Sequence, residues 1–162
     1  MTVTMIPITT VGYEKLKDEL RRLKITERPQ VILEIAEARK HGDLSENAEY
    51  HAAREKQSFI EGRIQELEDK LSRLQVIPQG SGKTEKVVFG SVVRLRDVSD
   101  DSKGEEKSYR IVGDLEADIK NNAISLSSPL AASLINKTVG DVVTVNLPRG
   151  ERDYEVVDIN LG

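Results

Sequence analysis

The chain has 162 residues, of which 32% are charged and 4% aromatic, a composition that favours a helix-rich protein with a modest hydrophobic core. The net charge of −4 argues against general nucleic-acid binding through counterion release, and the absence of cysteine excludes a disulfide framework and a cysteine-based metal site. Neither a secretory leader nor an apolar segment of membrane-spanning length is evident, so we expect a cytoplasmic protein.

The first predicted helix begins near Thr9 or Thr10, because either hydroxyl group can cap a helix N-terminus. Its apolar residues follow spacings of four and three: Leu16, Leu20 and Leu23. This spacing places the leucine side chains on one face of the helix and indicates packing against a long partner helix.

Pro29 interrupts this helix. Because proline has no backbone donor and clashes with the preceding turn, it predicts a kink or a restart near Arg28, with Thr26 or Glu27 as the cap of the restarted helix. The apolar stripe is then expected to resume at Ile32, Ile35 and Ala36. Gly42 follows in the position typical of a glycine at a helix C-terminus.

A second long helix is predicted after the acidic segment 41–50. Its apolar residues recur at spacings of four, three, four and three: Ile60, Ile64, Leu67, Leu71 and Leu74. Two striped helices joined by a short turn make an antiparallel coiled-coil hairpin. With about 30 residues per arm and about 1.5 Å per residue, each arm would extend roughly 45 Å.

The turn between the arms permits two interpretations of Asp43 and Glu46. Their spacing is that of a capping box, in which Asp43 caps the second helix and Glu46 bonds back to the cap. The same carboxylates also suit Mg²⁺, although two alone would bind it weakly, so the tip would complete a site that a partner owns. His41 and His51 raise a zinc alternative, but their spacing matches no four-ligand zinc pattern.

The second half of the chain changes to the two-residue period of β-strands. A flexible linker containing glycine and serine is expected over 78–85. Four strands are predicted beyond it: Val87 to Leu95, Tyr109 to Val112, Val142 to Leu147 and Tyr154 to Ile159. Ser128 can cap a short helix that begins at Pro129 and runs to about Ile135. The predicted fold class is therefore α+β, a helical hairpin followed by a small antiparallel β-sheet domain.

The hairpin tip closely resembles that of bacterial transcript-cleavage factors of the Gre family, and of its GreA branch in particular. The matching residues are Glu37-Ala38-Arg39 and His41-Gly42-Asp43-Leu44-Ser45-Glu46-Asn47-Ala48-Glu49-Tyr50-His51-Ala52-Ala53-Arg54-Glu55. The likeness continues in the second half at residues 109–114, 116–118, 124–125 and 128–130. We expect a hairpin domain over 1–77 with its tip near 41–47, and the resemblance implies an FKBP-like fold for residues 86–162.

The resemblance implies a function in transcription. Gre factors insert their hairpin into the secondary channel of RNA polymerase and stimulate the polymerase to cleave backtracked transcripts, which releases a short 3′ fragment. By this likeness, Asp43 and Glu46 help to hold the second catalytic Mg²⁺ in the polymerase active site. The expected partners are therefore RNA polymerase and the RNA 3′ end. The chain itself would be a monomer with no cofactor of its own, no membrane partner and no free-standing enzymatic activity.

The resemblance also assigns contacts beyond the two acids. Arg39 and Arg54 hold the positions that contact extruded RNA, whereas Lys40 and Lys56 are as well explained by ion pairs on the helix surface. The expected polymerase-docking residues are Asp114, Glu116, Ser128 and Pro129. Each of these four can equally be a turn or cap residue that shapes its own loop.

Three alternative functions remain at this point. A Gre-like inhibitor would occupy the channel without promoting cleavage, but such relatives have more heavily acidic tips. A prolyl isomerase or chaperone with an FKBP-like fold would need an aromatic-walled pocket, for which the second half offers only Phe89, Tyr109 and Tyr154. A purely structural hairpin, such as a prefoldin-like chaperone, would explain neither the tip sequence nor the second domain.

Overall fold

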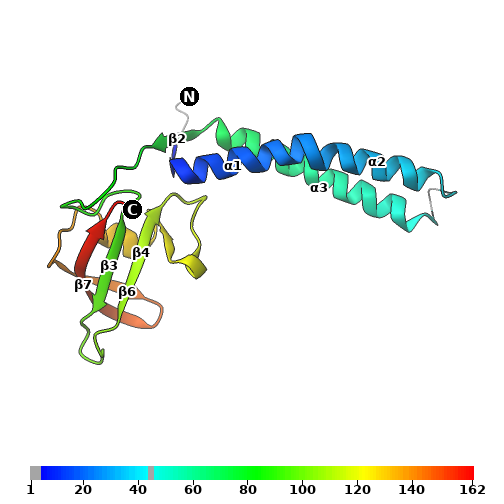
Figure 1. Cartoon of the computed structure of the whole chain (residues 1–162). Helices are drawn as coiled ribbons and strands as arrows, with labels where there is room; N and C mark the ends of the chain where they lie inside the picture. Colours follow the sequence, from blue (N-terminus) through cyan, green and yellow to red (C-terminus); the bar gives the residue numbers. More distant parts are fainter. Residues whose placement is uncertain (1–4, 44–45) are drawn as a thin grey trace. The chain divides into compact units, whose positions relative to one another are not determined.

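The computed structural model describes residues 5–43 and 46–162, which form two compact units (Figure 1). The first unit includes residues 13–74, and the second combines residues 5–12 with 75–162. The sequence had suggested one hairpin domain over 1–77, but the structure groups residues 5–12 with the second unit. Within that unit, Thr9 hydrogen-bonds to Glu116, 107 positions away in the chain.

The first arm of the hairpin begins where the sequence predicts. Helix α1 (Thr10–Arg22) starts after Thr9, whose Oγ1 accepts a hydrogen bond from the Gly12 amide at 3.1 Å. Such a bond satisfies one of the four amides that lack an intrahelical partner at a helix N-terminus. A π-helical turn (Leu23–Glu27) follows, and helix α2 (Arg28–Arg39) completes the arm.

The irregularity expected near Pro29 is present as the π-helical turn, but the predicted restart of the helix and its cap are wrong. Glu27 precedes α2 with helical backbone angles and without a capping hydrogen bond, so the arm continues through the π-helical turn rather than restarting. A π-turn holds one more residue than an α-turn. The extra residue moves the buried face one position forward from where the seven-residue spacing after Leu23 would place it, so that Val31 is 0% exposed, while the predicted Ile32 is 51% exposed. Of the predicted stripe, Ile35 is buried as expected, but Ile32 and Ala36 are exposed, so that part of the prediction is wrong.

Helix α3 (Ala48–Leu71) returns along the first arm and forms the predicted seam. Its buried residues Ile60, Ile64 and Leu67 pack with a set from the first arm: Leu16, Leu20, Leu23 and Val31. The expected seam residue Leu74 lies beyond the helix, in strand β2. No helix in the described part of the chain is both long and apolar enough to cross a lipid bilayer.

Ion pairs between the arms flank this seam. The Arg28 guanidinium donates to both carboxylate oxygens of Glu61, at 2.7 and 2.8 Å, and Arg63 donates likewise to Glu19, at 2.7 and 3.0 Å. Such partly solvated pairs contribute little to stability by themselves, but the two-point geometry favours one alignment of the arms. The pairs therefore support the register that the apolar seam sets.

The second unit contains a five-stranded sheet of order β5-β4-β3-β7-β6 and most of a two-stranded sheet, β1-β2. The strands are β1 (Ile6–Thr9), β2 (Leu74–Ile77), β3 (Val92–Asp97), β4 (Glu106–Val112), β5 (Ala123–Ser125), β6 (Val142–Leu147) and β7 (Gly150–Asn160). Strand β5 runs parallel to β4, and the other neighbours are antiparallel, so the α+β class is confirmed but the sheet is mixed. The strand predicted from Val87 begins only at Val92, because Gly90 turns the chain with a φ of +85°.

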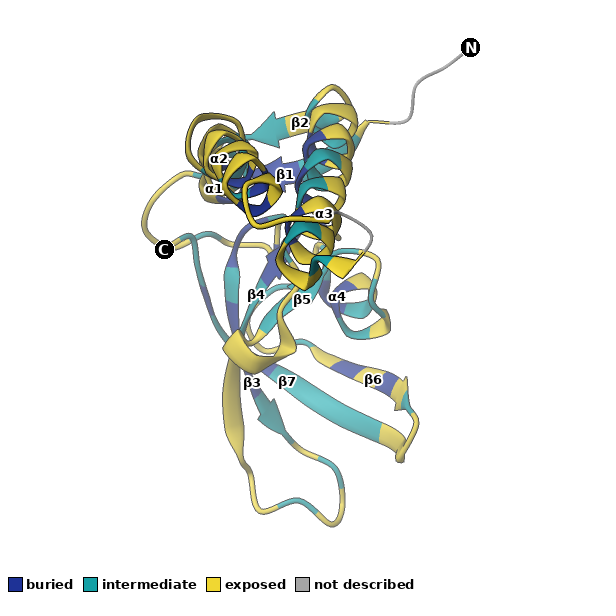
Figure 2. Ribbon diagram, turned by 90° about the vertical axis from the view of Figure 1, so that its right-hand side faces the viewer, coloured by how far each residue is buried: buried dark blue, intermediate teal, exposed yellow. Residues whose placement is uncertain are grey.

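One face of the sheet forms the core of the second unit with helix α4 (Pro129–Leu134). Ser128 caps this helix as predicted, with its Oγ accepting from the Ala131 amide at 3.3 Å. Ala131 and Leu134 then pack against buried strand residues. Figure 2 shows the alternation of buried and exposed residues along β6, which matches the two-residue period in its sequence.

Candidate functional site at the hairpin tip

The hairpin tip begins where α2 ends. After Arg39 the helix closes with backbone hydrogen bonds from Lys40 to Glu37 and from His41 to Ala38, both at 3.1 Å. Gly42 then adopts a φ of +118°, which strains any residue with a side chain. The predicted role of Gly42 in ending the first arm is therefore confirmed, and the chain turns directly into the acidic segment.

Asn47, rather than Asp43, caps the second arm. Its backbone is extended, and its Oδ1 accepts a hydrogen bond from the Tyr50 amide at 3.1 Å. Helix α3 therefore starts at Ala48, too far along the chain for Asp43 and Glu46 to form its capping box. The sequence interpretation missed Asn47, although asparagine before a run of helix-forming residues is itself a strong capping signal.

Asp43 and Glu46 are both exposed and belong to the same small surface. The Glu46 amide donates to the Asp43 carbonyl oxygen at 3.3 Å, which keeps the two residues adjacent. With four other residues they line an open concavity of about 490 Å³: His41, Asn47, Ala48 and Glu49. Leu44 and Ser45, which complete the tip sequence, lie outside the described residues.

The donor set of this concavity fits a shared Mg²⁺ site. Carboxylate oxygens are the ligands that Mg²⁺ prefers, and this ion commonly takes only one or two of them from a single protein. Among the described residues, no group of three or more histidine, aspartate or glutamate side chains is arranged to hold an ion. His51 instead packs edge-on against Tyr50, with 5.6 Å between the ring centroids, so nothing supports the zinc alternative.

Four basic side chains surround the tip, and they differ in their partners. Lys40 pairs with Glu37 at 3.1 Å, and Lys56 pairs across the arms with Glu34 at 3.2 Å. Both lysines therefore form ion pairs on the helix surface, which was one of the two interpretations. The partner of Lys56 is Glu34, however, and not the neighbouring Glu55 that the sequence suggested.

The two arginines have no carboxylate within ion-pair distance in the described part of the chain. Arg39 lies over the Tyr50 ring, 5.9 Å from its centroid, and Arg54 donates to Gln57 at 3.3 Å. Both are exposed, so their guanidinium groups remain accessible to a phosphate. A role in RNA contact stays a prediction for both.

Three of the four predicted docking residues lie close together in the second unit. Asp114 is exposed and accepts hydrogen bonds from the Ser125 hydroxyl and, at 2.8 Å, from the Ser127 hydroxyl, which lower the pKa of Asp114. Ser127 leads directly into Ser128 and the exposed Pro129. A docking role for this surface stays a prediction.

Glu116, the fourth predicted docking residue, has a structural role within the second unit. Its carboxylate accepts from the Thr9 amide at 3.0 Å, from the Thr9 hydroxyl, and from the Gly113 amide at 2.9 Å. A Cβ atom at Gly12 would collide with the same carboxylate, so a larger residue here would displace Glu116 from these hydrogen bonds. These contacts support the alternative in which Glu116 shapes its own loop, although they do not test docking.

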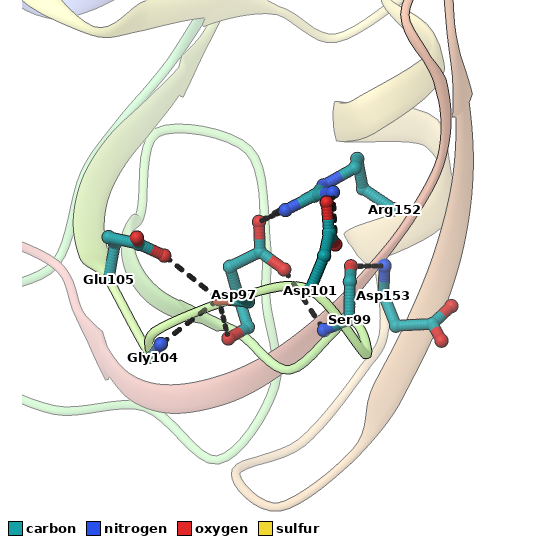
Figure 3. Close-up of polar contacts among 8 residues, drawn as sticks. Asp97, Ser99, Asp101, Gly104, Glu105, Arg152 and Asp153 are labelled. Atoms are coloured by element: carbon teal, nitrogen blue, oxygen red, sulfur yellow. Dashed lines mark hydrogen bonds and ion pairs between the residues drawn. The ribbon is translucent and has the colours of Figure 1, made fainter.

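A second cavity, of about 260 Å³, lies on the sheet beside Tyr109 and Tyr154. Its lining residues Arg152 and Asp97 bind each other at 2.7 Å, and Arg152 also reaches Asp101 beside the cavity at 2.7 Å (Figure 3). Nearby, the Ser99 hydroxyl accepts from the Asp153 amide. Burial by itself would raise the pKa of Asp97, but hydrogen bonds from Arg152 and Ser99 outweigh burial and hold this pKa below its ordinary value of 3.8.

These bonds tie the loop after β3 to strand β7. The isomerase alternative gains little from the cavity, because Phe89, the third aromatic residue considered for a proline pocket, is not among its lining residues.

Known proteins match both halves of the chain. Residues 6–76 match the family model "Transcription elongation factor, N-terminal", and residues 82–161 match "Transcription elongation factor, GreA/GreB, C-term". The chain is 56% identical over 158 residues to transcription elongation factor GreA of Alkalilimnicola ehrlichii, covering 97% of this chain and 98% of that protein. It is 57% identical over 154 residues to transcription elongation factor GreA of Thioalkalivibrio sulfidiphilus, covering 94% and 96%. A solved structure, GreA factor homolog 1 of Thermus thermophilus, is 32% identical with coverage of 96% and 98% and a TM-score of 0.42.

Proposed function

Because the chain belongs to the GreA/GreB family of transcription elongation factors, we propose that it stimulates RNA polymerase to cleave backtracked transcripts. In this proposal the helical hairpin enters the secondary channel of the polymerase in the cytoplasm and brings its tip to the RNA 3′ end. Cleavage releases a short 3′ fragment, after which elongation resumes. The polymerase performs the hydrolysis, and the chain acts as an accessory factor.

The observation that most supports this proposal is the pair of exposed carboxylates in one concavity at the tip. Neither Asp43 nor Glu46 caps α3, since Asn47 has that role. The two carboxylates would therefore complete the ligand set of a Mg²⁺ that the polymerase holds in its own active site. When bound, such an ion orients and activates water for attack on a phosphodiester.

Other residues would bind and orient the partners. Arg39 and Arg54 would contact phosphates of the extruded RNA, to which arginine can donate two parallel hydrogen bonds. The surface around Asp114, Ser128 and Pro129 would dock on the rim of the polymerase channel. Glu116 would support that surface through its bond to Gly113.

The decisive experiment uses backtracked elongation complexes with Mg²⁺ and follows the shortening of labelled RNA from its 3′ end. The variant Asp43→Asn/Glu46→Gln keeps the side-chain shapes and removes both negative charges. We expect stimulated cleavage to fall by about 100-fold or more, because an amide oxygen is a much weaker metal ligand than a carboxylate. Folding should be unchanged, since the cap of α3 is untouched.

A matched control makes the same change of charge elsewhere. The variant Asp100→Asn/Glu151→Gln alters two exposed acids of the second unit and should stimulate cleavage like the native chain. Cleavage that survives in the tip variant would refute the proposed role of the acids. A native chain that binds polymerase and never stimulates cleavage would instead indicate the channel-binding inhibitor.

A further inference from the structure

Asn47 connects the two arms of the hairpin beside the acidic residues. Its Oδ1 accepts from the Tyr50 amide at the start of α3, while its Nδ2 donates to the Ala38 carbonyl oxygen near the end of α2, at 2.6 Å. We propose that Asn47 is a positioning residue, whose two amide bonds hold Asp43 and Glu46 in the geometry that receives Mg²⁺. This inference rests on the function proposed above.

The first of these bonds does not require asparagine. An N-cap needs one short acceptor, and aspartate or serine serves about as well as asparagine. If capping were the only task of residue 47, the three residues would be interchangeable. The capping bond to Tyr50 therefore explains the start of α3 but not the identity of the side chain.

The second bond requires a donor on the same short side chain. Ala38 is buried and lies in the last turn of α2, where its carbonyl oxygen accepts from the His41 amide at 3.1 Å and has a second lone pair for the Asn47 amide. A side-chain amide has an acceptor oxygen and a donor nitrogen on separate atoms, so it can face both arms at once. An ionised aspartate has no donor, and serine has only one oxygen for both tasks. Asparagine is thus suited to join the arms at this point.

The link closes the segment that contains both acids. The bond between Asn47 and Ala38 joins the ends of a loop of eight residues, 39–46, and Asn47 itself lines the same concavity as Asp43 and Glu46. Fixing the ends of a short loop reduces the number of conformations that its residues sample. Two carboxylates held in place lose less entropy when they bind an ion than two carboxylates on a mobile loop. We therefore expect the tip to bind Mg²⁺ more tightly with this bond than without it.

Two substitutions separate the bonds. Asn47→Ser and Asn47→Asp keep a capping acceptor and remove the amide donor, and the serine variant does so without adding charge. In the cleavage assay, we expect Asn47→Ser to need about tenfold more Mg²⁺ for half-maximal stimulation, the effect of losing one hydrogen bond. Stimulation at saturating Mg²⁺ should approach that of the native chain. A purely structural role would instead lower cleavage by the same factor at every Mg²⁺ concentration.

A second measurement needs neither metal nor polymerase. Backbone ¹⁵N relaxation of the free protein reports motion of individual amides, with order parameters of about 0.85 for rigid and below about 0.6 for flexible backbone. In Asn47→Ser, the Tyr50 amide should stay rigid because the cap is kept, while the amides of His41, Asp43 and Glu46 should become flexible. Asn47→Ala should loosen Tyr50 as well.

The outcomes distinguish this inference from the proposed function. Native Mg²⁺ dependence and a rigid tip in Asn47→Ser, together with loss of cleavage in Asp43→Asn/Glu46→Gln, would overturn the positioning role alone. Full cleavage in the acid variant would overturn both claims. A raised Mg²⁺ requirement together with a flexible tip in Asn47→Ser would establish the positioning role.

Discussion

Asp114 and Glu116 are two positions apart and have opposite environments. Asp114 is exposed and bonds to two serine hydroxyls, whereas Glu116 is half-buried and accepts from two backbone amides and a hydroxyl. A carboxylate with three such donors is difficult to replace, because its loss leaves the amides of Thr9 and Gly113 without partners.

We therefore expect Glu116→Gln to lower the free energy of unfolding by about 1–3 kcal/mol, since a neutral amide oxygen is a weaker acceptor for the two backbone amides than a carboxylate. Urea unfolding followed by circular dichroism would measure the change. The control Glu151→Gln removes the same charge from an exposed position and should change the stability by less than about 0.5 kcal/mol. Equal effects in the two variants would contradict the role assigned to Glu116.

At the tip, the residue types were predictable and their contacts were not. The two acids and the flanking arginines could be proposed from the sequence, but the spacing of Asp43 and Glu46 also suggested the cap of α3, which the structure assigns to Asn47. Local sequence patterns report only on neighbouring residues. The bond between Asn47 and Ala38 joins different helices, so no periodicity or spacing signals it.

At the scale of elements, the π-helical turn decides which side chains of the first arm are buried. Leu23 and Val31 are eight residues apart, about one more than two α-helical turns would hold, yet both belong to the seam. A regular helix would have placed Gln30 at this point of the seam, seven residues after Leu23, whereas the sequence interpretation favoured Ile32. The wider turn was not recognisable because it depends on Pro29 and on packing against α3 together.

This shift predicts unequal costs for two adjacent substitutions. Val31→Ala should lower the free energy of unfolding by about 1.5–3 kcal/mol because it leaves a cavity in the seam. Ile32→Ala removes more atoms from an exposed position and should cost less than about 0.5 kcal/mol. Urea unfolding of both variants would measure this, and a larger cost at Ile32 would show that the stripe runs as the simple helical pattern suggests.

Among the other elements, the long ones were predicted from the sequence and the shortest strands were not. The long helices, the caps at Thr9 and Ser128, and the strand pair β6 and β7 agreed with their local patterns. The short strands β1, β2 and β5 were missed, because three or four residues carry too little periodicity to be recognised. Each of these short strands depends on hydrogen bonds to a partner strand, which a local sequence pattern does not show.

At the scale of the whole molecule, lowered carboxylate pKa values predict how stability depends on pH. A hydrogen bond from Arg63 lowers the pKa of Glu19 below its ordinary value of 4.5, and a backbone hydrogen bond from Thr138 lowers that of Asp141 below 3.8. For a lowered pKa, the stabilisation is fully present above the ordinary value and is lost as the pH falls through the folded-state value. Both units contain such groups.

We therefore expect the melting temperature to be nearly constant between about pH 7 and pH 5 and to fall progressively below about pH 4.5. Thermal unfolding followed by circular dichroism at several pH values would measure this. Glu19→Gln should show a smaller acid-induced decrease, because residue 19 no longer takes up a proton. A melting temperature that rises on acidification would contradict the assignment.

The composition of the second unit from residues 5–12 and 75–162 has a consequence for the order of synthesis. Strand β1 is synthesised early, but Thr9 cannot form its hydrogen bonds to Glu116 until 107 further residues have been made. At bacterial rates of translation this delay is about 5–20 seconds. The last strand to appear, β7, lies between β3 and β6 in the finished sheet. The arms of the hairpin are contiguous and can pair during translation, whereas the second unit closes only when the chain is nearly complete.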